Sequence, residues 1–560
     1  MSKSVRTCRS HAPANSLHIR RRLSCLAIAA CFASADAFAL PVGAQVVNGT
    51  ATMAQAGNVL TVTNSNGAII NWQQFNIGAG QTTRFEQASA SSSVLNRVLA
   101  SDPSVILGNL TSNGRVWLVN PAGIFVGQGA RIDAAAFVAS TLNVTNADFL
   151  ANRMKFDNSL GSAGNVVNQG KITTPMGGSV YLIGSNVTNE GIITTPRGET
   201  ILAAGQTVEL IDSATPGVKV EITGAEGNVT NLGAITAEAG RIGIAGVVVR
   251  NSGRLNASSV VEEGGRIFLR ATKKIELTES SRVGADGTAG GSVTAIVSEN
   301  GQISGELVGR GEISAQGNGQ TGSGGFVETS AAAVRIEDGF GVRAGGGSWL
   351  IDPLDFTIAS GSGSQTISGI GATTLQTNLA GTSVTIQTDA STVGNGDIFV
   401  NSAVSWSSAN SLTLQAHRNI DVNANLTSSG TGTINLHADF VSPDGIGAIQ
   451  RGSASNIISQ AAGTVTLRAG SGITATVNGT SNILDAQTTS GSILLDHSSG
   501  ILAIESALSL NSLTITGGTL QGAGNIDVSG AFNWTGTSAI AGSGTLTTLG
   551  GSTTAIAPNF

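Results

Sequence analysis

Apolar and polar side chains alternate in short runs from Val46 onward, and glycine or asparagine ends most of these runs. Residues 178–182 and 265–269 are examples, in which a glycine is followed by an apolar residue at every second position. Because neighbouring side chains of a strand point to opposite faces, such runs predict strands with one buried face, joined by tight turns. We find no helical periodicity of useful length, so the pattern predicts an all-β protein.

The runs repeat along the chain. An Asn-x-Gly-x-Ile/Leu phrase recurs at intervals of 21, 42 and 20 residues, with its glycines at Gly170, Gly191, Gly233 and Gly253. We interpret the long interval as two periods, with a skipped turn near residues 213–217. A second phrase, a glycine followed by an alternating strand, begins at Gly178, Gly240, Gly265, Gly291 and Gly325.

A strand and a turn repeated every ~20 residues are typical of one coil of a parallel β-helix. The competing β-sandwich or barrel seldom repeats its phrases in sequence. We therefore predict a right-handed single-stranded parallel β-helix, in which asparagines at equivalent positions stack in a ladder.

The leader and the tail differ from the repeats. A basic stretch that includes Arg20–Arg22 precedes the apolar run 23–35 and the small residues Ala37 and Ala39. This order predicts an extended signal peptide over 1–39, cleaved at Ala37 and Ala39, rather than a membrane anchor. We expect a secretion domain over 40–150, β-helix repeats over 151–350, and a less regular Ser/Thr/Gly-rich tail over 351–560. The tail repeats at an offset of 20 residues and ends without a cap, which we interpret as truncation.

Charge and cysteine content narrow the function. Without the leader the chain has 23 basic and 34 acidic residues and no basic patch, which argues against a nucleic-acid partner. All three cysteines lie in the leader. A chain without disulfides can cross a second membrane unfolded, although a β-helix that needs no disulfides explains the same absence. We predict no transmembrane segment in the mature chain.

Candidate chemistry is sparse. The mature chain has three histidines, His417, His437 and His497, at no metal-ligand spacing, and it has no thiol. Carboxylates are scattered rather than repeated at the coil spacing, as a polysaccharide-cleaving β-helix would require. We therefore predict no catalytic site, no metal and no cofactor.

Residues 43–145 contain several dense motifs. These are Gln45-Val46-Val47-Asn48-Gly49, Asn71-Trp72-Gln73-Gln74-Phe75-Asn76-Ile77, Leu95-Asn96-Arg97-Val98 and Asn120-Pro121-Ala122-Gly123-Ile124. They resemble the secretion domain of the filamentous-haemagglutinin family of two-partner secretion exoproteins. The family's motif is Asn-Pro-Asn-Gly-Ile, so this chain departs from it at Ala122. Its Asn-Pro-Asn-Leu motif has no match here.

The resemblance implies export through the periplasm. The expected partner is an outer-membrane transporter barrel whose POTRA domains bind the secretion domain before it folds. The implied secretion-motif residues are Asn96, Arg97, Asn120, Pro121, Ala122, Gly123 and Ile124. From the residues alone, 120–124 is a tight turn between two coils, because Pro121 cannot join a strand ladder and Asn120 and Gly123 favour turns. These residues are explained either by the shape of the turn or by recognition by the transporter, and both explanations stay open. Arg97 is expected either to cap carbonyls at the open end of the β-helix or to meet the partner.

The predicted function is that of a secreted or cell-surface adhesin, with a host-cell or neighbouring-cell receptor or a carbohydrate as its ligand. Two alternatives remain: the stalk of a contact-dependent growth-inhibition toxin, and a haem- or carrier-binding exoprotein. A toxin would require a distinct globular terminus, whereas residues 500–560 show only coil repeats. A haem site would require clustered histidine or tyrosine on adjacent coils.

Overall fold

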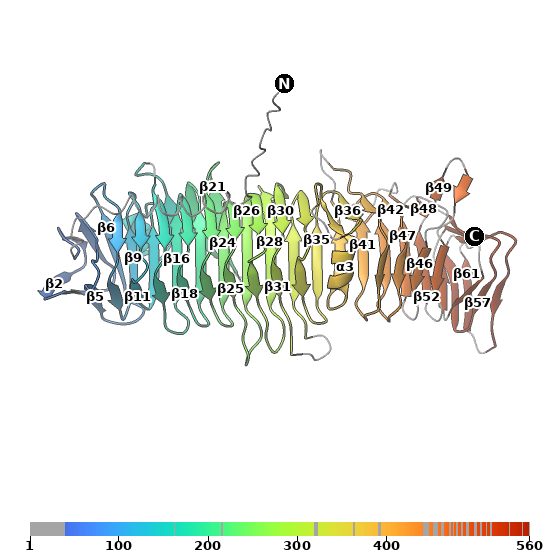
Figure 1. Ribbon diagram of the computed structural model, residues 1–560, viewed down its shortest axis with the longest axis horizontal. Coiled ribbons are helices and arrows are strands. Elements are labelled where there is room, and N and C mark those ends of the chain that lie inside the picture. The colour runs from blue at the N-terminus through green and yellow to red at the C-terminus, as the bar shows by residue number, and fades with distance from the viewer. Residues whose placement is uncertain are drawn as a thin grey trace, which may run out of the picture. The chain divides into compact units, whose positions relative to one another are not determined.

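The computed structural model describes residues 40–560, apart from residues 162, 214–216, 319–322, 362–364, 390–393, 441–446, 452–456, 461–463, 470–471, 474, 478–479, 483–484, 489–491, 498–500, 504–506, 511, 516–517, 537, 551–552 and 559–560. The predicted signal peptide, with Ala37 and Ala39, lies outside the described residues. Residues 40–560 form one compact unit. Within it the coils follow one another in chain order, from blue to red in Figure 1.

Each regular coil contains three short strands that pair in parallel with the equivalent strands of the coils before and after it. The coil of β9 (Arg115–Val119), β10 (Ile124–Val126) and β11 (Arg131–Asp133) pairs with β12 (Ala136–Ser140), β14 (Asn165–Asn168) and β15 (Lys171–Thr173) of the next coil. The equivalent strands thus form three stacks, which we call columns A, B and C. The fold is a parallel β-helix, and the predicted fold class is confirmed.

Column A contains, besides β9 and β12, the strands β4 (Ala68–Trp72), β6 (Ser93–Val98), β16 (Ser179–Gly184), β19 (Glu199–Ala204), the first part of β24 (Arg241–Asn251) and of β26 (Arg266–Leu277), β28 (Ser292–Glu299), β32 (Phe326–Ser330), β35 (Ser348–Asp352), β38 (Ser383–Gln387), β41 (Leu412–Ala416), β44 (Ile434–Ala438), β47 (Thr464–Ala469), β52 (Ser492–His497), β55 (Ser512–Ile515), β58 (Ala531–Gly536) and β61 (Thr553–Pro558).

Column B contains, besides β10 and β14, the strands β7 (Ser104–Ile106), β17 (Asn186–Asn189), β22 (Asn228–Asn231), the second part of β24 and of β26, β30 (Glu306–Gly309), β33 (Ala333–Ile336), β36 (Phe356–Ala359), β37 (Gly369–Gly371), β39 (Ile398–Val400), β42 (Ile420–Val422), β45 (Ala448–Arg451) and β48 (Gly472–Ile473). Column C contains, besides β11 and β15, the strands β3 (Val59–Asn64), β5 (Thr82–Gln87), β8 (Asn109–Ser112), β18 (Ile192–Thr194), β23 (Ala234–Thr236), β25 (Arg254–Asn256), β27 (Arg282–Gly284), β31 (Glu312–Ser314) and β34 (Gly341–Arg343).

The first coil is covered by antiparallel strands. Strand β1 (Gln45–Asn48) pairs antiparallel with β4, and β2 (Ala51–Ala56) pairs antiparallel with β3. Because parallel pairing begins with β3 and β4, the strands β1 and β2 cover the first coil of the stack. Most side chains of β1 and β2 are exposed.

The asparagines of the repeated phrase stack inside the β-helix as predicted. Asn168 donates from Nδ2 to Oδ1 of Asn189 over 2.8 Å, Asn189 donates in the same way to Asn231, and Asn231 donates to Asn251. Asn251 closes the row by donating to Oγ of Ser281 at 2.6 Å. All five side chains are fully buried, so each coil supplies the acceptor that the previous coil's amide requires.

The glycine of each phrase allows two coils to approach closely. A Cβ added to Gly233 would lie 2.0 Å from the carbonyl oxygen of Gly191, and one added to Gly253 would lie 2.1 Å from that of Gly233. The second phrase shows the same contact, since a Cβ on Gly265 would lie 2.2 Å from the oxygen of Gly240. In both repeated phrases the glycine therefore occupies a position at which any side chain would collide with the backbone of the neighbouring coil.

The 42-residue interval in the first phrase is one coil, not two, and this part of the sequence interpretation was wrong. Strand β17 pairs directly with β22, with Asn189 opposite Asn231. The additional residues form an excursion, in which β20 (Thr207–Ser213) and β21 (Gly217–Thr223) pair with each other and β20 pairs with β13 (Met154–Asp157). The extra length therefore leaves the stack and returns to it without skipping a coil.

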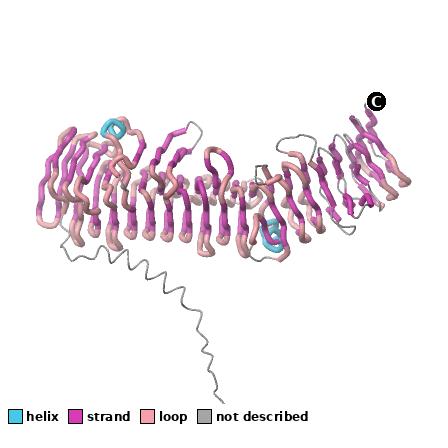
Figure 2. Tube along the Cα trace, turned by 90° about the horizontal axis from the view of Figure 1, so that it is seen from above, coloured by secondary structure: helices cyan, strands magenta, loops and turns pink. Residues whose placement is uncertain are grey.

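Among the described residues two short helices interrupt the strands, and the absence of helical periodicity in the sequence did not predict them (Figure 2). Helix α2 (Asn146–Leu150) lies in the excursion that follows β12, with Thr145 as its N-cap. Helix α3 (Ala372–Leu379) lies next to β34, the last strand of column C. Asn378 accepts from the backbone N–H of Val342 at 2.6 Å and donates to the carbonyl of Phe340. Its side-chain amide therefore takes the hydrogen bonds that a further strand beside β34 would otherwise make.

Beyond α3 the coils continue with less regular strands. Parallel pairs link β40 (Val404–Trp406), β43 (Leu426–Ser428), β46 (Ile457–Gln460) and β51 (Asp485–Thr488), and shorter stacks link β53 (Ile501–Ala503), β56 (Gly518–Gln521) and β59 (Ser538–Ile540), and β54 (Leu508–Leu510), β57 (Ile526–Val528) and β60 (Leu546–Thr548). The antiparallel pair of β49 (Ala475–Val477) and β50 (Thr480–Asn482) branches off here, as the pair of β28 and β29 (Gln302–Ile303) does before α3. The predicted 20-residue offset is confirmed, because Leu520 pairs with Ile540 and Ile526 with Leu546. The domain borders at 150 and 350 stay predictions.

Candidate functional site

The segment Asn120–Ile124 forms the corner between β9 and β10. These are two strands of the same coil, so the expectation that the turn joins two coils was wrong in this respect. The corner packs on the next coil, because the carbonyl of Pro121 accepts from the backbone N–H of Gly164 at 2.7 Å. The flanking apolar strands are present as predicted, and Ile124 lies in the inner core with 1% of its surface exposed.

The side chain of Asn120 holds the corner together. Its Oδ1 accepts from the backbone N–H of Ala122 at 3.0 Å, and its Nδ2 donates to the carbonyl of Asp102 and to Oγ of Ser104, both at 3.0 Å. The side chain is completely buried. An amide is required here because it donates and accepts at once, which neither a carboxylate nor an alcohol does in the same shape.

The other residues of the corner contribute mainly through their backbone. Gly123 has φ of +134°, a conformation that L side chains rarely adopt. Ala122 takes part through its backbone N–H, and its side chain is partly exposed. This explains why the turn is complete although alanine replaces the family's second asparagine.

Asn96 and Arg97 lie side by side on β6 and point in opposite directions. Asn96 occupies an inward position, between Ile70 and Leu118 in register, and is fully buried. Its Oδ1 accepts from Nε1 of Trp72 at 2.9 Å, and its Nδ2 donates to the carbonyl of Trp117 at 3.2 Å. These bonds satisfy an amide that would otherwise be costly within an apolar core.

Arg97 points outward and holds the excursion that leads into α2. It donates to the carbonyl of Val144 at 2.8 Å and to Oδ1 of Asn146 at 3.0 Å, and burial lowers the pKa of its guanidinium. Arg97 therefore does cap a carbonyl, but on the side of the β-helix rather than at its open end. It is also the register partner of Val119, directly before the corner.

A second hydrophobic core covers the outer face of column A around this site. Its strand residues are Ile69, Leu95, Trp117, Val119, Val138, Ile183, Ile201 and Ala203, and its covering residues include Val144, Phe149, Phe156, Val208 and Leu210. The Trp117 ring meets Phe149 edge-on at 5.3 Å and stacks on Phe156 at 5.9 Å. Because both faces of β9 and β12 are buried, these strands lack an exposed face.

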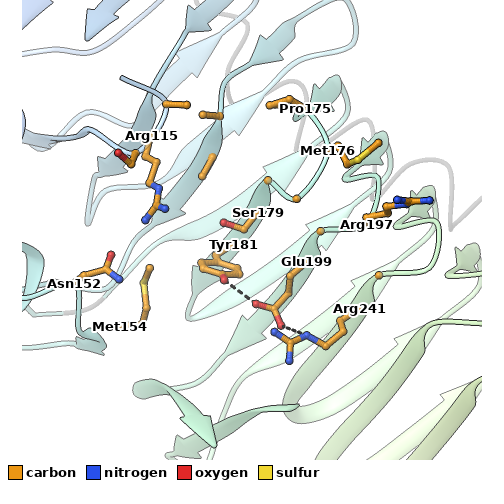
Figure 3. A pocket seen from close by; sticks show the side chains of 18 of the residues that line it. Arg115, Asn152, Met154, Pro175, Met176, Ser179, Tyr181, Arg197, Glu199 and Arg241 are labelled. Atoms are coloured by element: carbon orange, nitrogen blue, oxygen red, sulfur yellow. Dashed lines mark hydrogen bonds and ion pairs between the residues drawn. The ribbon is translucent and has the colours of Figure 1, made fainter. Parts of the chain in front are cut away.

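A pocket of about 780 Å³ opens beside this outer core. It is bounded by the outward side chains at the start of the column A strands, by the 175–178 turn and by Asn152 and Met154 of the excursion (Figure 3). The outward row reads Arg115, Ala136, Ser179, Glu199 and Arg241 on five successive coils. The hollow arises where the small Ala136 and Ser179 stand between long side chains.

A chain of polar contacts crosses the floor of the pocket. The hydroxyl of Tyr181 donates to Oε2 of Glu199 at 2.7 Å, and Nε of Arg241 lies 3.1 Å from Oε1 of the same carboxylate. Burial and then the charge of Glu199 raise the pKa of Tyr181 above its usual range, so the phenol stays neutral. Glu199 is 7% exposed, and its two partners compensate its burial.

The sequence did not single out Tyr181, Glu199 or Arg241 as a site. The glycine phrase at Gly178 and Gly240 placed Ser179 and Arg241 at equivalent positions, but the intervening coil, with Gly198 and Glu199, was not recognised. Among the described residues no cluster of histidine, cysteine or carboxylate side chains is arranged to hold a metal ion. In the same part of the chain, no helix has the length and apolar character needed to cross a bilayer.

The fold and the buried corner agree with the comparisons with known proteins. Residues 37–294 match the family model described as the TPS secretion domain, so the resemblance to two-partner secretion exoproteins is confirmed over this part of the chain. The crystal structure of the HMW1 secretion domain from Haemophilus influenzae superposes with a TM-score of 0.54 at 28% sequence identity, covering 71% of this chain and all of that one.

Two curated relatives share part of this chain. Both are named heme/hemopexin-binding protein and come from Haemophilus influenzae. One is 37% identical over 141 residues, which are 25% of this chain and 16% of the relative, and the other is 34% identical over 129 residues, which are 23% and 14%. The match thus spans about a sixth of the relatives' length.

Proposed function

We propose that this chain is a secreted or surface-displayed adhesin-type exoprotein, and that its transporter recognises the Asn120–Ile124 segment before the β-helix folds. The observation that carries this proposal is the burial of Asn96 and Asn120. Their side-chain groups are occupied by Trp72, Asp102, Ser104 and the backbone, so a partner has access to them only in an extended chain. An extended chain can add a strand to a sheet edge of the transporter's periplasmic domains.

Folding outside the cell then favours outward movement. Each newly emerged coil supplies acceptors for the buried amides of the coil before it, as Asn189 does for Asn168. Because the interactions are between nearest neighbours, folding propagates coil by coil from the covered first coil. Export by this route needs no nucleotide hydrolysis on the outer side.

The experiment compares export with and without the transporter in cells that express the full chain. Asn120→Ala is expected to leave the protein in the periplasm, and Ala122→Asn, which restores the family motif, is expected to be exported at least as well as the parent. The control is Asn228→Ala, which changes an exposed asparagine outside both the motif and the buried row and is expected to be exported like the parent. Normal amounts of Asn120→Ala in the medium, or export without the transporter, would contradict the proposal.

A haem- or carrier-binding exoprotein is the second candidate, because the two curated relatives carry the name heme/hemopexin-binding protein. The proposed adhesin and this candidate share the export route and differ in ligand. The single tyrosine, Tyr181, donates a hydrogen bond to Glu199, and its pKa is raised, which disfavours the phenolate needed for an axial haem ligand. Titration of the secreted protein with haem, followed by its Soret absorbance, separates the two candidates.

A further inference from the structure

The pocket on the outer face of column A has the size of a small-ligand site and a mostly polar lining. Its volume of about 780 Å³ lies within the range of about 300–1,000 Å³ that such sites occupy. It combines polar side chains with the apolar surfaces of Met154, Pro175 and Met176. Its position on the side wall leaves it separate from the Asn120 corner, so export and binding do not use the same atoms.

The charges in the pocket are unevenly matched. Arg241 is paired with Glu199 inside the pocket, and Arg197 is paired with Glu262. Arg115, which lines the same pocket on the opposite side from Arg241, has no ion pair among the described residues (Figure 3). Four coil steps of ~4.8 Å separate the two arginines along the row. The pocket therefore presents one uncompensated cation at one end and a neutral hydrogen-bonding chain at the other.

These features disfavour two other ligand classes. The strands β9, β12, β16 and β19 that underlie the pocket are each paired on both sides, so a peptide has no free edge to extend. A nucleobase would need an open aromatic face, but Tyr181 is the only aromatic residue lining the pocket and it packs against the outer core. A ligand with many hydroxyls and one negative charge fits both ends.

We propose that this pocket binds a carboxylate-bearing sugar of an acidic glycan. The guanidinium of Arg115 faces the carboxylate, and Ser179, Asn152 and the Tyr181–Glu199–Arg241 chain face the ring hydroxyls. Arginine suits this role because its planar fork matches a carboxylate. This inference rests on the proposed adhesin function and adds a ligand class to it. Export assays do not test ligand binding.

The test is calorimetric titration of the secreted protein with a hyaluronan tetrasaccharide, which carries glucuronate carboxylates, and with neutral chitotetraose. The acidic fragment is expected to bind more tightly. Arg115→Gln is expected to weaken that binding about tenfold or more, because it removes a charge-assisted contact. Arg131→Gln, an exposed arginine on column C of the same coil, is the matched control and is expected to bind like the parent.

A second variant tests whether the sugar binds in this pocket, independently of the charge of Arg115. Ser179→Leu fills the hollow and is expected to abolish binding of both sugars while thermal unfolding and export stay close to those of the parent. Absence of binding by the acidic tetrasaccharide, equal binding of acetate at the same concentration, or parent-like affinity of both variants would overturn the inference. Failure of the parent protein to leave the cell through the transporter would instead count against the proposed function, and protein recovered from the periplasm would then be titrated with the same sugars.

Discussion

Asn231 donates from Nδ2 to Oδ1 of Asn251, 2.8 Å away on the next coil, and neither side chain is exposed. The same Asn231 accepts from Asn189 of the preceding coil. Asn189, Asn231 and Asn251 thus each accept from the preceding coil and donate to the following one. The row runs in one direction along the chain, so each new coil completes the hydrogen bonds of the one before it.

Removal of one amide from this row should destabilise two coil interfaces. Asn231→Ala leaves the Nδ2 of Asn189 and the Oδ1 of Asn251 without their partner, and we expect a loss of about 2–4 kcal/mol in the free energy of unfolding. Denaturant unfolding followed by circular dichroism measures this loss. Asn228→Ala changes an exposed asparagine of the same strand β22 and should cost far less. Equal effects of the two variants would show that the buried row is not what holds the coils together.

A methyl group on the phrase glycine should be as harmful as a lost amide. Gly233→Ala places a Cβ 2.0 Å from the carbonyl oxygen of Gly191, so the two coils must separate locally. We expect a lower thermal unfolding temperature and faster amide hydrogen exchange in β18 and β23. Gly129→Ala is the control, because a Cβ there meets nothing within 4 Å. Unchanged exchange in Gly233→Ala would contradict the close-contact explanation.

The excursion that carries α2 should depend on the outer core. Phe156→Ala removes a ring that stacks on Trp117 at 5.9 Å, and a large-to-small change at such a site costs about 3–5 kcal/mol. Since the inner core is untouched, we expect the loss to appear mainly as faster proteolysis of residues 141–157. Leu160→Ala, at an exposed position, is the control. If both variants were cleaved at the parent rate, the outer core would not be holding the segment.

Stability should depend on pH through Asp352. Burial, followed by the charges of Glu328 and Asp389, raises the pKa of Asp352 to about 7. An unfolded aspartate titrates near 3.9. Between these values the folded state binds the additional proton, so this group's contribution to stability is present below about pH 4 and is lost as pH rises to about 7. Asp352→Asn should reduce that slope in unfolding measured from pH 4 to 8, whereas exposed Asp338→Asn should leave it unchanged.

The repeats were readable from the sequence because they follow local rules. Alternation, the phrase glycines and the stacked asparagines each report on a contact with the equivalent residue one coil away, and a period of about 20 residues makes that contact visible in one dimension. The corner at Asn120–Ile124 was recognisable for the same reason. Its residues make most of their bonds within a short stretch of chain, from Asp102 to Ile124.

The excursions could not be predicted from the sequence because they interrupt the 20-residue repeat. The residues of β20 and β21 looked like an additional coil, since they alternate just as coil strands do, and only their antiparallel pairing sets them apart. The sequence around outward apolar residues such as Trp117 and Val138 does not indicate which segment of the chain packs on them. Helix α3 was missed because it occupies the place of a strand and depends on Asn378 meeting β34.

The sequence by itself determined the coil: its length, its buried asparagines, its close-packed glycines and the turn that resembles a secretion motif. The tertiary structure decided what lies on the outside of the coils, namely the outer core over column A and the pocket between Arg115 and Arg241. The physical reason is that inward contacts repeat with the chain, whereas outward contacts depend on register across several coils and on inserted segments that have no period.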